Sequence, residues 1–383
     1  MDWCQPEASR RPPRPRALVS ELAGAWALAD VRAFLGTQGL DQPTPLVRLP
    51  ALAASLGVAE IWVKDESARM GLNSFKALGG AYAVARLVLE AAGERAGRAV
   101  GFNELAEPAV REVAAALTFV CATDGNHGRA VALGARLTGA KAVVFVHPGV
   151  APARRALLAR DGAEVRVTAG VYDDALKAAR EAASANGWAL VSDCGFEGYE
   201  AIPRLIMRGY GVLADEALAA RRRGPTHVFA QGGVGGLAGA LAAALKQPRP
   251  SAPRRRLVVV EPDRAPCLLA SARAGAPVKI PEDEPTVMAL LECYEPSLTA
   301  WRLLASAADL YVAVGDELAT EAARRFAEPL GADPALASSE SGAAGLAGLI
   351  AAAGDPRLRA AAGLESGARV LLINSERRID ASS

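Results

Sequence analysis

Short apolar runs alternate with alanine-rich stretches along most of this 383-residue chain, and this alternation restricts the possible folds more than any other feature. The apolar runs have the length and the β-branched content of buried strands, whereas the stretches between them have the composition of helices. The strand-like runs are residues 143–146, 164–167, 189–192, 228–230, 257–261 and 370–373. A helix between successive strands lets each strand pair in parallel with another. The pattern therefore predicts an α/β fold with mainly parallel sheets, and the length suffices for two domains.

Composition and charge narrow the range of functions. The formal net charge of +1 gives no reason to expect nucleic acid or a polyanionic surface as a partner. No run approaches the roughly 20 apolar residues that a membrane-spanning helix requires, so we expect no membrane association. Five cysteines without a Cys-x-x-Cys pair predict reduced thiols, a cytoplasmic location and no bound metal. Residues 1–16 are rich in arginine and proline but lack the apolar segment of a secretory signal, and we expect a disordered tail there.

The first of three motifs is L-N-S-F-K-A-L-G-G, residues 72–80. It places Lys76 at the start of a helix, after a strand-like run at residues 61–64 and a polar turn. Asn73 or Ser74 can cap this helix, and the small residues after Lys76 allow another element to pack closely. A desolvated lysine has a lowered pKa, and its free amine can form a Schiff base with a carbonyl group. A lone lysine of this kind is more often a surface residue, so the interpretation depends on two further motifs.

The second motif is C-A-T-D-G-N-H-G-R-A-V-A, residues 121–132, between a strand-like run and a helical stretch. Its polar turn contains Thr123, Asp124, Gly125, Asn126 and His127. Backbone N–H groups and the Asn126 amide at a helix N-terminus suit a carboxylate, so we predict that these five residues bind the substrate. The alternative for Asp124, next to a glycine, is a turn residue that bonds its own backbone. We interpret His127 as structural rather than catalytic.

The third motif is Q-G-G-V-G-G-L-A-G-A, residues 231–240, again between a strand-like run and a small-residue helix. Gly232, Gly233, Gly235 and Gly236, with Val234 between them, allow the backbone to fold around a phosphate with its amides pointing inward. The motif is not the G-x-x-x-x-G-K-[ST] loop of nucleoside-triphosphate sites, and it lacks the G-x-G-x-x-G spacing of dinucleotide sites. It therefore predicts a phosphate-bearing ligand of another kind.

A Schiff-base lysine, an anion-binding turn and a phosphate-cradling glycine loop together resemble the pyridoxal-phosphate enzymes of fold type II, the tryptophan synthase β family. Within this family the chain is most similar to the diaminopropionate ammonia-lyases. The likeness runs from Thr44 to about Ile373 and includes, besides the three motifs, residues 62–69, 196–203, 206–211, 258–263 and 339–343. Its specific part is Asp124, because most relatives that deaminate serine or threonine carry Ser-x-Gly-Asn at this turn.

The resemblance implies two three-layer αβα domains with a mainly parallel sheet in each. Residues 91–204 would form the small domain, and residues 17–90 together with 205–383 would form the large domain. Pyridoxal 5'-phosphate, the expected cofactor, would lie in the cleft between them. A homodimer is expected from the relatives alone.

The resemblance also assigns roles to individual residues. Lys76 would hold the cofactor aldehyde as a Schiff base and act as a base on one face of the substrate, with Asp124 as the base on the opposite face. Asp193 would lie near the distal amine of the substrate, and a cap at a strand end is the alternative for it. Ser375 would bind the ring nitrogen of the cofactor. The predicted cofactor-binding set is completed by Phe75, Asn126 and the glycine loop.

Two segments depart from the family pattern. In residues 286–296, Leu290 and Tyr294 replace glycines and Glu292 adds a charge, so we expect these side chains to reshape the substrate pocket. In residues 374–380, Arg377 replaces a glycine without an evident reason.

The leading hypothesis is a pyridoxal-phosphate-dependent α,β-elimination that converts 2,3-diaminopropionate, in its L and its D form, into pyruvate and two molecules of ammonia. The first alternative is β-elimination or β-replacement on another β-substituted amino acid, in the manner of a serine or threonine dehydratase or of a biosynthetic enzyme. The second alternative is a catalytically silent binding relative, against which the retention of Lys76, Asp124 and the glycine loop argues. In each enzymatic hypothesis the substrate is a small amino acid.

Overall fold

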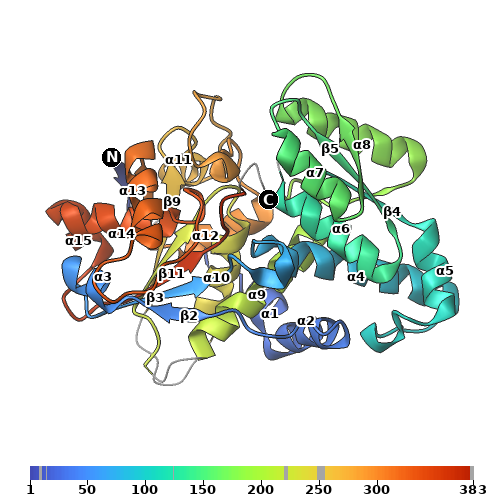
Figure 1. Cartoon of the computed structure of the whole chain (residues 1–383), viewed down its shortest axis with the longest axis horizontal. Coiled ribbons are helices and arrows are strands. Elements are labelled where there is room, and N and C mark those ends of the chain that lie inside the picture. Colours follow the sequence, from blue (N-terminus) through green and yellow to red (C-terminus); the bar gives the residue numbers. More distant parts are fainter. Residues whose placement is uncertain (8–10, 14, 124, 220–222, 248–254, 380–383) are drawn as a thin grey trace.

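The computed structural model describes residues 1–7, 11–13, 15–123, 125–219, 223–247 and 255–379. These residues form two separate β-sheets with helices packed against them, and Figure 1 shows the sheets in two lobes. The α/β class with mainly parallel sheets, predicted from the alternating pattern, is confirmed.

The larger sheet has seven strands, of which the five inner ones pair in parallel and the two edge strands pair antiparallel. In spatial order they are β1 (Asp2–Cys4), β10 (Leu310–Val314), β9 (Arg256–Pro262), β8 (His227–Gln231), β11 (Arg369–Asn374), β3 (Glu60–Asp65) and β2 (Leu46–Arg48). Strands β1, β2 and β10 are additions to the strands predicted from the sequence. The two edge strands have only three residues each, too few to show a period.

Successive residues of the inner strands enter two different cores. Val258 and Val260 of β9 face one side of the sheet, and Leu257 and Val259 face the other. The first side is covered by α3 (Pro50–Ser55), α13 (Asp316–Ala327), α14 (Ala344–Gly354) and α15 (Pro356–Ala362). The second is covered by α1 (Arg16–Ala23), α2 (Ala25–Thr37), α9 (Ala201–Ala219), α10 (Gly236–Lys246), α11 (Cys267–Ala274) and α12 (Leu298–Ala307). Because both faces are buried, the central residues of these strands are consecutive apolar residues instead of an alternating pattern.

The smaller sheet is entirely parallel and lies in the lobe drawn in green and teal in Figure 1. Its strands, in spatial order, are β6 (Ala163–Val167), β5 (Lys141–Val146), β4 (Thr118–Ala122) and β7 (Ala189–Leu190). Helix α8 (Tyr172–Asn186) covers one face. The other face is covered by α5 (Pro108–Ala116), α6 (Asn126–Thr138) and α7 (Pro152–Arg160). All four strands fall within the continuous segment 91–204.

Helix α4 (Lys76–Ala96) lies where the two lobes meet, packed against α6 of one lobe and α9 of the other. The packing is close at its first turns: a Cβ atom on Gly79 would lie 2.5 Å from the Ile206 carbonyl oxygen. A Cβ atom on Gly80 would lie 2.6 Å from the Ala130 Cβ. These approaches explain the small residues after Lys76, and they fix the Lys76 end of the helix between the two sheets.

Residues 2–4 correct the expectation of a disordered tail through residue 16. They form β1, in which Trp3 pairs with Val312 of β10 in antiparallel register. The carboxylate of Asp2 is held by Arg273 of α11, with one bond of 2.6 Å. The outer edge of β10 would otherwise expose unpaired backbone groups, which is the physical reason for a short covering strand.

Short 3₁₀ helices at Arg69–Gly71, Phe102–Glu104 and Ala289–Leu291 complete the elements. Among the residues described, no helix combines the length and the apolar character needed to cross a bilayer. The same residues contain no group of three or more His, Cys, Asp or Glu side chains placed to hold a metal ion.

Candidate active site

The three sequence motifs meet at the carboxyl ends of parallel strands. Lys76 begins α4 after β3, Asn126 begins α6 after β4, and Gly236 begins α10 after β8. Ser375 directly follows β11, which lies between β8 and β3 in the larger sheet. Ligands of α/β folds bind at this end of the strands, where loops and helix N-termini converge. The strand order therefore explains how segments far apart in the sequence form one site.

The loop that presents Lys76 has an unusual backbone. Met70 and Asn73 adopt left-handed conformations, with φ of 49° and 64°, which are uncommon for residues other than glycine. The carbonyl of Leu72, between them, accepts a hydrogen bond of 2.8 Å from the buried Arg129 side chain of α6. A cation from the small lobe thus helps to hold the loop in this conformation.

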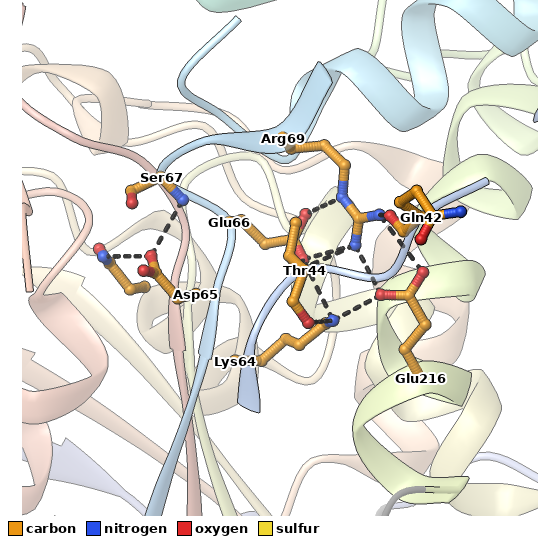
Figure 2. Close-up of polar contacts among 9 residues, drawn as sticks. Gln42, Thr44, Lys64, Asp65, Glu66, Ser67, Arg69 and Glu216 are labelled. Atoms are coloured by element: carbon orange, nitrogen blue, oxygen red, sulfur yellow. Dashed lines mark hydrogen bonds and ion pairs between the residues drawn. The ribbon is translucent and has the colours of Figure 1, made fainter. Parts of the chain in front are cut away.

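A buried ionic network supports the other end of this loop, as Figure 2 shows. The side chains of Lys64, Glu66, Arg69 and Glu216 are 1%, 0%, 2% and 7% exposed. Glu216 of α9 accepts bonds from Lys64 Nζ at 2.5 Å and from Arg69 Nη2 at 2.7 Å. Glu66 accepts a bond from Arg69 Nε at 2.7 Å and one from the Thr44 hydroxyl at 2.5 Å. These four charged residues, here the Lys64–Glu216 network, balance two cations with two anions and tie β3 and the lysine loop to α9.

Lys76 forms an ion pair with Asp193, which follows β7 of the small sheet. Burial by itself lowers the pKa of Lys76, but the Asp193 carboxylate outweighs it, so the pKa of the amine lies above its ordinary value. Burial raises the pKa of Asp193, but the Lys76 ammonium group opposes it, and the pKa of the carboxyl group lies below its ordinary value. The expectation that desolvation frees the Lys76 amine is therefore wrong for this arrangement: the amine keeps its proton while it faces Asp193.

His127 lies behind this ion pair. Its Nε2 bonds to the Val191 carbonyl oxygen at 2.7 Å, which requires the proton on Nε2. Its Nδ1 lies 4.0 Å from Asp193 Oδ2, and burial lowers the pKa of the imidazole. The neutral ring is anchored through Nε2, whereas its buried Nδ1 has no hydrogen-bond partner among the described residues.

Asn126 contacts a residue to which the sequence analysis assigned no role. Its amide Nδ2 donates a hydrogen bond to the carboxylate of Glu376, the residue after Ser375. The hydroxyl of Ser339 donates to the other carboxylate oxygen at 2.5 Å. Burial raises the pKa of Glu376 to about 7, and the bonds from Ser339 and Asn126 together with the nearby cations Arg154 and Lys76 oppose this shift. A second carboxyl group is thus part of the site.

The glycine loop has the backbone geometry of a phosphate cradle. Among the described residues, no hydrogen bond occupies the backbone N–H groups of Gly233, Val234 and Gly236 at the start of α10. Gly235 has φ of 97°, and a Cβ atom there would lie 3.0 Å from the Ala300 Cβ. Free amides at a helix N-terminus bind anionic oxygen atoms, so the loop fits a phosphate group.

Tyr210 of α9 places a hydroxyl beside this loop. The residue is buried, and within the described part of the chain its Oη has no hydrogen-bond partner. Its Cε2 lies 3.6 Å from the position that a Cβ atom of Gly236 would take, and its ring packs edge-on against Phe75 with the centroids 4.8 Å apart. Burial raises the pKa of this phenol, which therefore stays a donor. Buried hydroxyl groups normally have a partner, and a phosphate oxygen in the cradle would supply one.

Ser375 lies at the end of β11, with 4% of its surface exposed. Its carbonyl oxygen accepts a bond of 3.1 Å from the Phe75 N–H, which joins this segment to the start of the lysine helix. The preceding Asn374 donates to Asp65 Oδ1 at 2.9 Å and to the Ala337 carbonyl at 2.8 Å. The backbone on which Ser375 sits is thus fixed from three sides, and its role toward the ring nitrogen stays a prediction.

Asp124 lies outside the described residues. Of its two neighbours, Gly125 donates its N–H to the Thr123 hydroxyl oxygen at 3.0 Å, which closes the turn. The assignment of Asp124 as a base therefore rests on the sequence alone.

Two of the residues that depart from the family pattern contact each other. Glu292 accepts a bond of 3.0 Å from the Tyr294 hydroxyl and one of 3.3 Å from the Thr286 N–H, so the added charge and the added ring engage each other. Leu290 and Tyr294 do not have positive φ, and neither does the exposed Arg377. Glycine is therefore not required by the backbone at these positions.

The family match decides which cofactor this site serves. Residues 37–376 match the family model described as "Pyridoxal-phosphate dependent enzyme". The chain is a pyridoxal-phosphate-dependent enzyme. The cofactor predicted from the lysine and the glycine loop is thus confirmed, and the residues present fit it at two points, with an amine for the aldehyde and free amides for the phosphate.

The enzyme is similar to proteins named diaminopropionate ammonia-lyase. It is 40% identical over 341 residues to the one from Escherichia coli (strain K12), and the alignment covers 88% of this chain and 84% of that protein. The crystal structure of the Escherichia coli enzyme in complex with D-serine has a TM-score of 0.86 at 34% identity and covers 100% of this chain and 95% of that chain. The structure of the same enzyme in complex with an aminoacrylate-PLP azomethine reaction intermediate has a TM-score of 0.84 at 35% identity, with 100% and 94% covered. The fold type and the resemblance inferred from the motifs are confirmed.

Sequence reasoning missed Glu376, Ser339 and Tyr210. Ser339 and Tyr210 lie in segments that carried the resemblance, residues 339–343 and 206–211, and Glu376 follows Ser375, to which a role had been assigned. For Glu376 the available signal was its position shortly after the apolar strand-like run at residues 370–373, because a glutamate that is buried at such a place needs polar partners.

Proposed function

We propose that this enzyme eliminates the β-amine of 2,3-diaminopropionate, in both enantiomeric forms, to give pyruvate and two molecules of ammonia. The observation that carries the proposal is the ion pair between Lys76 and Asp193. An anion beside the reactive lysine attracts the β-ammonium group of diaminopropionate more strongly than a neutral β-hydroxyl.

The reaction needs a proton removed at the α-carbon and an amine expelled at the β-carbon. When bound, pyridoxal phosphate supplies the carbonyl that condenses with the α-amine and the electron sink for the pair released at the α-carbon. Lys76, once displaced from the cofactor, takes the α-proton on one face, and Asp124 takes it on the other. The electron pair of the broken C–H bond forms the Cα–Cβ double bond, and the β-nitrogen leaves with the electrons of the C–N bond as ammonia. Hydrolysis of the released enamine consumes one water and yields pyruvate and the second ammonia.

The other residues of the site hold these groups in place. Asp193 keeps the Lys76 amine charged before the cofactor binds, and it faces the ammonium leaving group afterwards. The amides of Gly233, Val234 and Gly236 receive the phosphate, and Ser375 offers a neutral partner to the ring nitrogen. Support for elimination comes from the relatives, whose complexes contain D-serine and an aminoacrylate-PLP intermediate.

The test compares the two enantiomers in one variant. Asp124→Asn keeps the size and much of the hydrogen bonding of the side chain but removes the base. Turnover of D-diaminopropionate should fall by about 10²–10⁴-fold, the usual contribution of a positioned base, with substantial activity left on the L form. Asp173→Asn, an exposed aspartate of α8 that pairs with Lys279 at 3.4 Å, is the matched control and should leave both rates unchanged.

Two outcomes would contradict the proposal. Equal loss of both activities in Asp124→Asn would make Asp124 a structural residue or a base shared by both enantiomers. Release of a 2-oxo acid by the wild type from serine (pyruvate), threonine (2-oxobutyrate) or another β-substituted amino acid, but not from diaminopropionate, would assign the enzyme to a different substrate.

A further inference from the structure

Glu376 joins the segment before Lys76, the Asn126 turn and Ser339. Its backbone pairs with Ser74, two residues before Lys76, and its carbonyl oxygen accepts a bond of 3.2 Å from the Ser339 N–H. Its side chain, in a residue only 5% exposed, bonds to the Ser339 hydroxyl and to the amide of Asn126. The carboxylate therefore spans from the last strand of the larger sheet to the first residue of α6.

The Asn126 amide has no other anchor in the described residues. A side-chain amide can rotate by 180° and exchange its donor and acceptor ends, so a neighbour must select one orientation. A carboxylate accepts and cannot donate, and its bond to Nδ2 of Asn126 selects the orientation with the NH₂ group toward Glu376. One of the two N–H bonds is then used, and the second is available to a ligand.

We propose that Glu376 is a positioning residue that orients the Asn126 amide, so that its second N–H is presented to the cofactor and the two lobes are joined at the cofactor site. The inference rests on the assignment of Asn126 to cofactor binding in the proposed site. It adds a residue that acts through Asn126 and does not itself need to touch the cofactor.

The charge of Glu376 sets the strength of this contact. The groups that face it are the cations Arg154 of α7 and Lys76 of α4, together with the neutral side chains of Asn126 and Ser339. With the pKa raised to about 7, the carboxyl group is mostly protonated at pH 6 and mostly ionised at pH 8. Hydrogen bonds to an ionised acceptor are roughly twice as strong as neutral ones, a difference of about fivefold in an equilibrium constant.

The experiment measures the dissociation constant of pyridoxal phosphate by equilibrium dialysis at pH 6 and pH 8. The variants are Glu376→Gln, which keeps the shape but not the charge, and Asn126→Ala, with Glu340→Gln as the matched control. Glu340 lies next to Ser339 but pairs with Arg378 at the surface, at 2.6 Å. Glu376→Gln should bind the cofactor about fivefold more weakly than wild type at pH 8 and equally at pH 6, and Glu340→Gln should follow the wild type.

Each failure has its own signature. Wild-type affinity of Glu376→Gln at both pH values, with weakened binding in Asn126→Ala, would overturn the inference and leave the proposed site intact. Wild-type affinity of Asn126→Ala would overturn the assignment of Asn126 itself. If Glu376→Gln does not fold, Ser339→Ala removes one anchor of the same carboxylate and should reduce affinity at pH 8; an unchanged constant there overturns the inference equally.

Discussion

Glu216→Gln removes one charge from the Lys64–Glu216 network without changing the size of the side chain (Figure 2). Lys64 and Arg69 are then left with a single anion, Glu66, in a place where the side chains are at most 7% exposed. Loss of one partner from a buried ion pair typically costs 3–5 kcal/mol, because an uncompensated charge stays in a medium of low polarity. We expect a loss of free energy of unfolding of this size.

Deprotonation of Lys64 sets an independent upper limit on this loss of free energy of unfolding. Lys64 can escape the imbalance by releasing its proton, and burial already lowers its pKa in the intact network. Deprotonation of an amine with an ordinary pKa costs about 4.6 kcal/mol at pH 7. The cost falls as the pH rises toward the unfolded pKa of lysine, so the penalty of Glu216→Gln should be at least halved at pH 9.5.

The assay is urea denaturation of the holoenzyme, followed by far-ultraviolet circular dichroism at pH 7 and pH 9.5. The matched control is Glu321→Gln, whose carboxylate bonds Arg325 at 2.7 Å on the exposed side of α13 and should cost about 0–1 kcal/mol. The double variant Lys64→Met, Glu216→Gln restores a neutral network and should recover part of the loss. A cost for Glu216→Gln no larger than that of the control, without recovery in the double variant, would refute the account of a buried charge balance.

Borohydride reduction of the holoenzyme followed by peptide mapping should place the pyridoxyl group on Lys76, and a label on another lysine would contradict the assignment. Asp193→Asn removes the carboxylate that holds the pKa of Lys76 up, so the pH midpoint for association of cofactor with apoenzyme should move down; an unmoved midpoint would mean that Asp193 does not control the amine. Gly235→Val puts a side chain at φ of 97° and crowds Ala300, so cofactor affinity should fall about tenfold or more in equilibrium dialysis, and an unchanged affinity would exclude the loop as the cradle. The homodimer and the cytoplasmic location stay predictions; light scattering at micromolar concentration should give twice the chain mass of 39.5 kDa, and the mass of one chain would refute the dimer.

Much of the fold followed from local pattern. Apolar runs such as residues 257–261 read as buried strands because both faces of each sheet are covered, and that requirement acts on every residue of the strand. The edge strands could not be predicted in this way. Residues 2–4 have only three side chains, and they form a strand because the edge of β10 is open to pairing. Residues 310–314, which form β10, have the apolar composition of a buried strand in the sequence as well.

In the candidate site, too, some features follow from local sequence and others only from tertiary contacts. The lysine helix, the polar turn and the glycine loop each showed their chemistry in consecutive residues, because a helix N-terminus or a run of glycines determines which backbone groups are free. The hydrogen-bond and ion-pair partners of individual side chains could not be predicted from the sequence. Asp193 stands 117 residues from Lys76, and Glu376 stands 250 residues from Asn126, so no local pattern pairs them.

The sequence by itself determined the class of fold and the cofactor, since these depend on short segments and on the rule that loops after parallel strands share one end of a sheet. Only the tertiary structure decided the charge states. Lys76 keeps its proton because Asp193 lies against it, although burial alone lowers the pKa of the amine. Glu376 titrates near neutrality because it is buried between the two lobes. Electrostatic energies depend on the distance between charges and on their exposure to water, and both are set by how the two sheets come together.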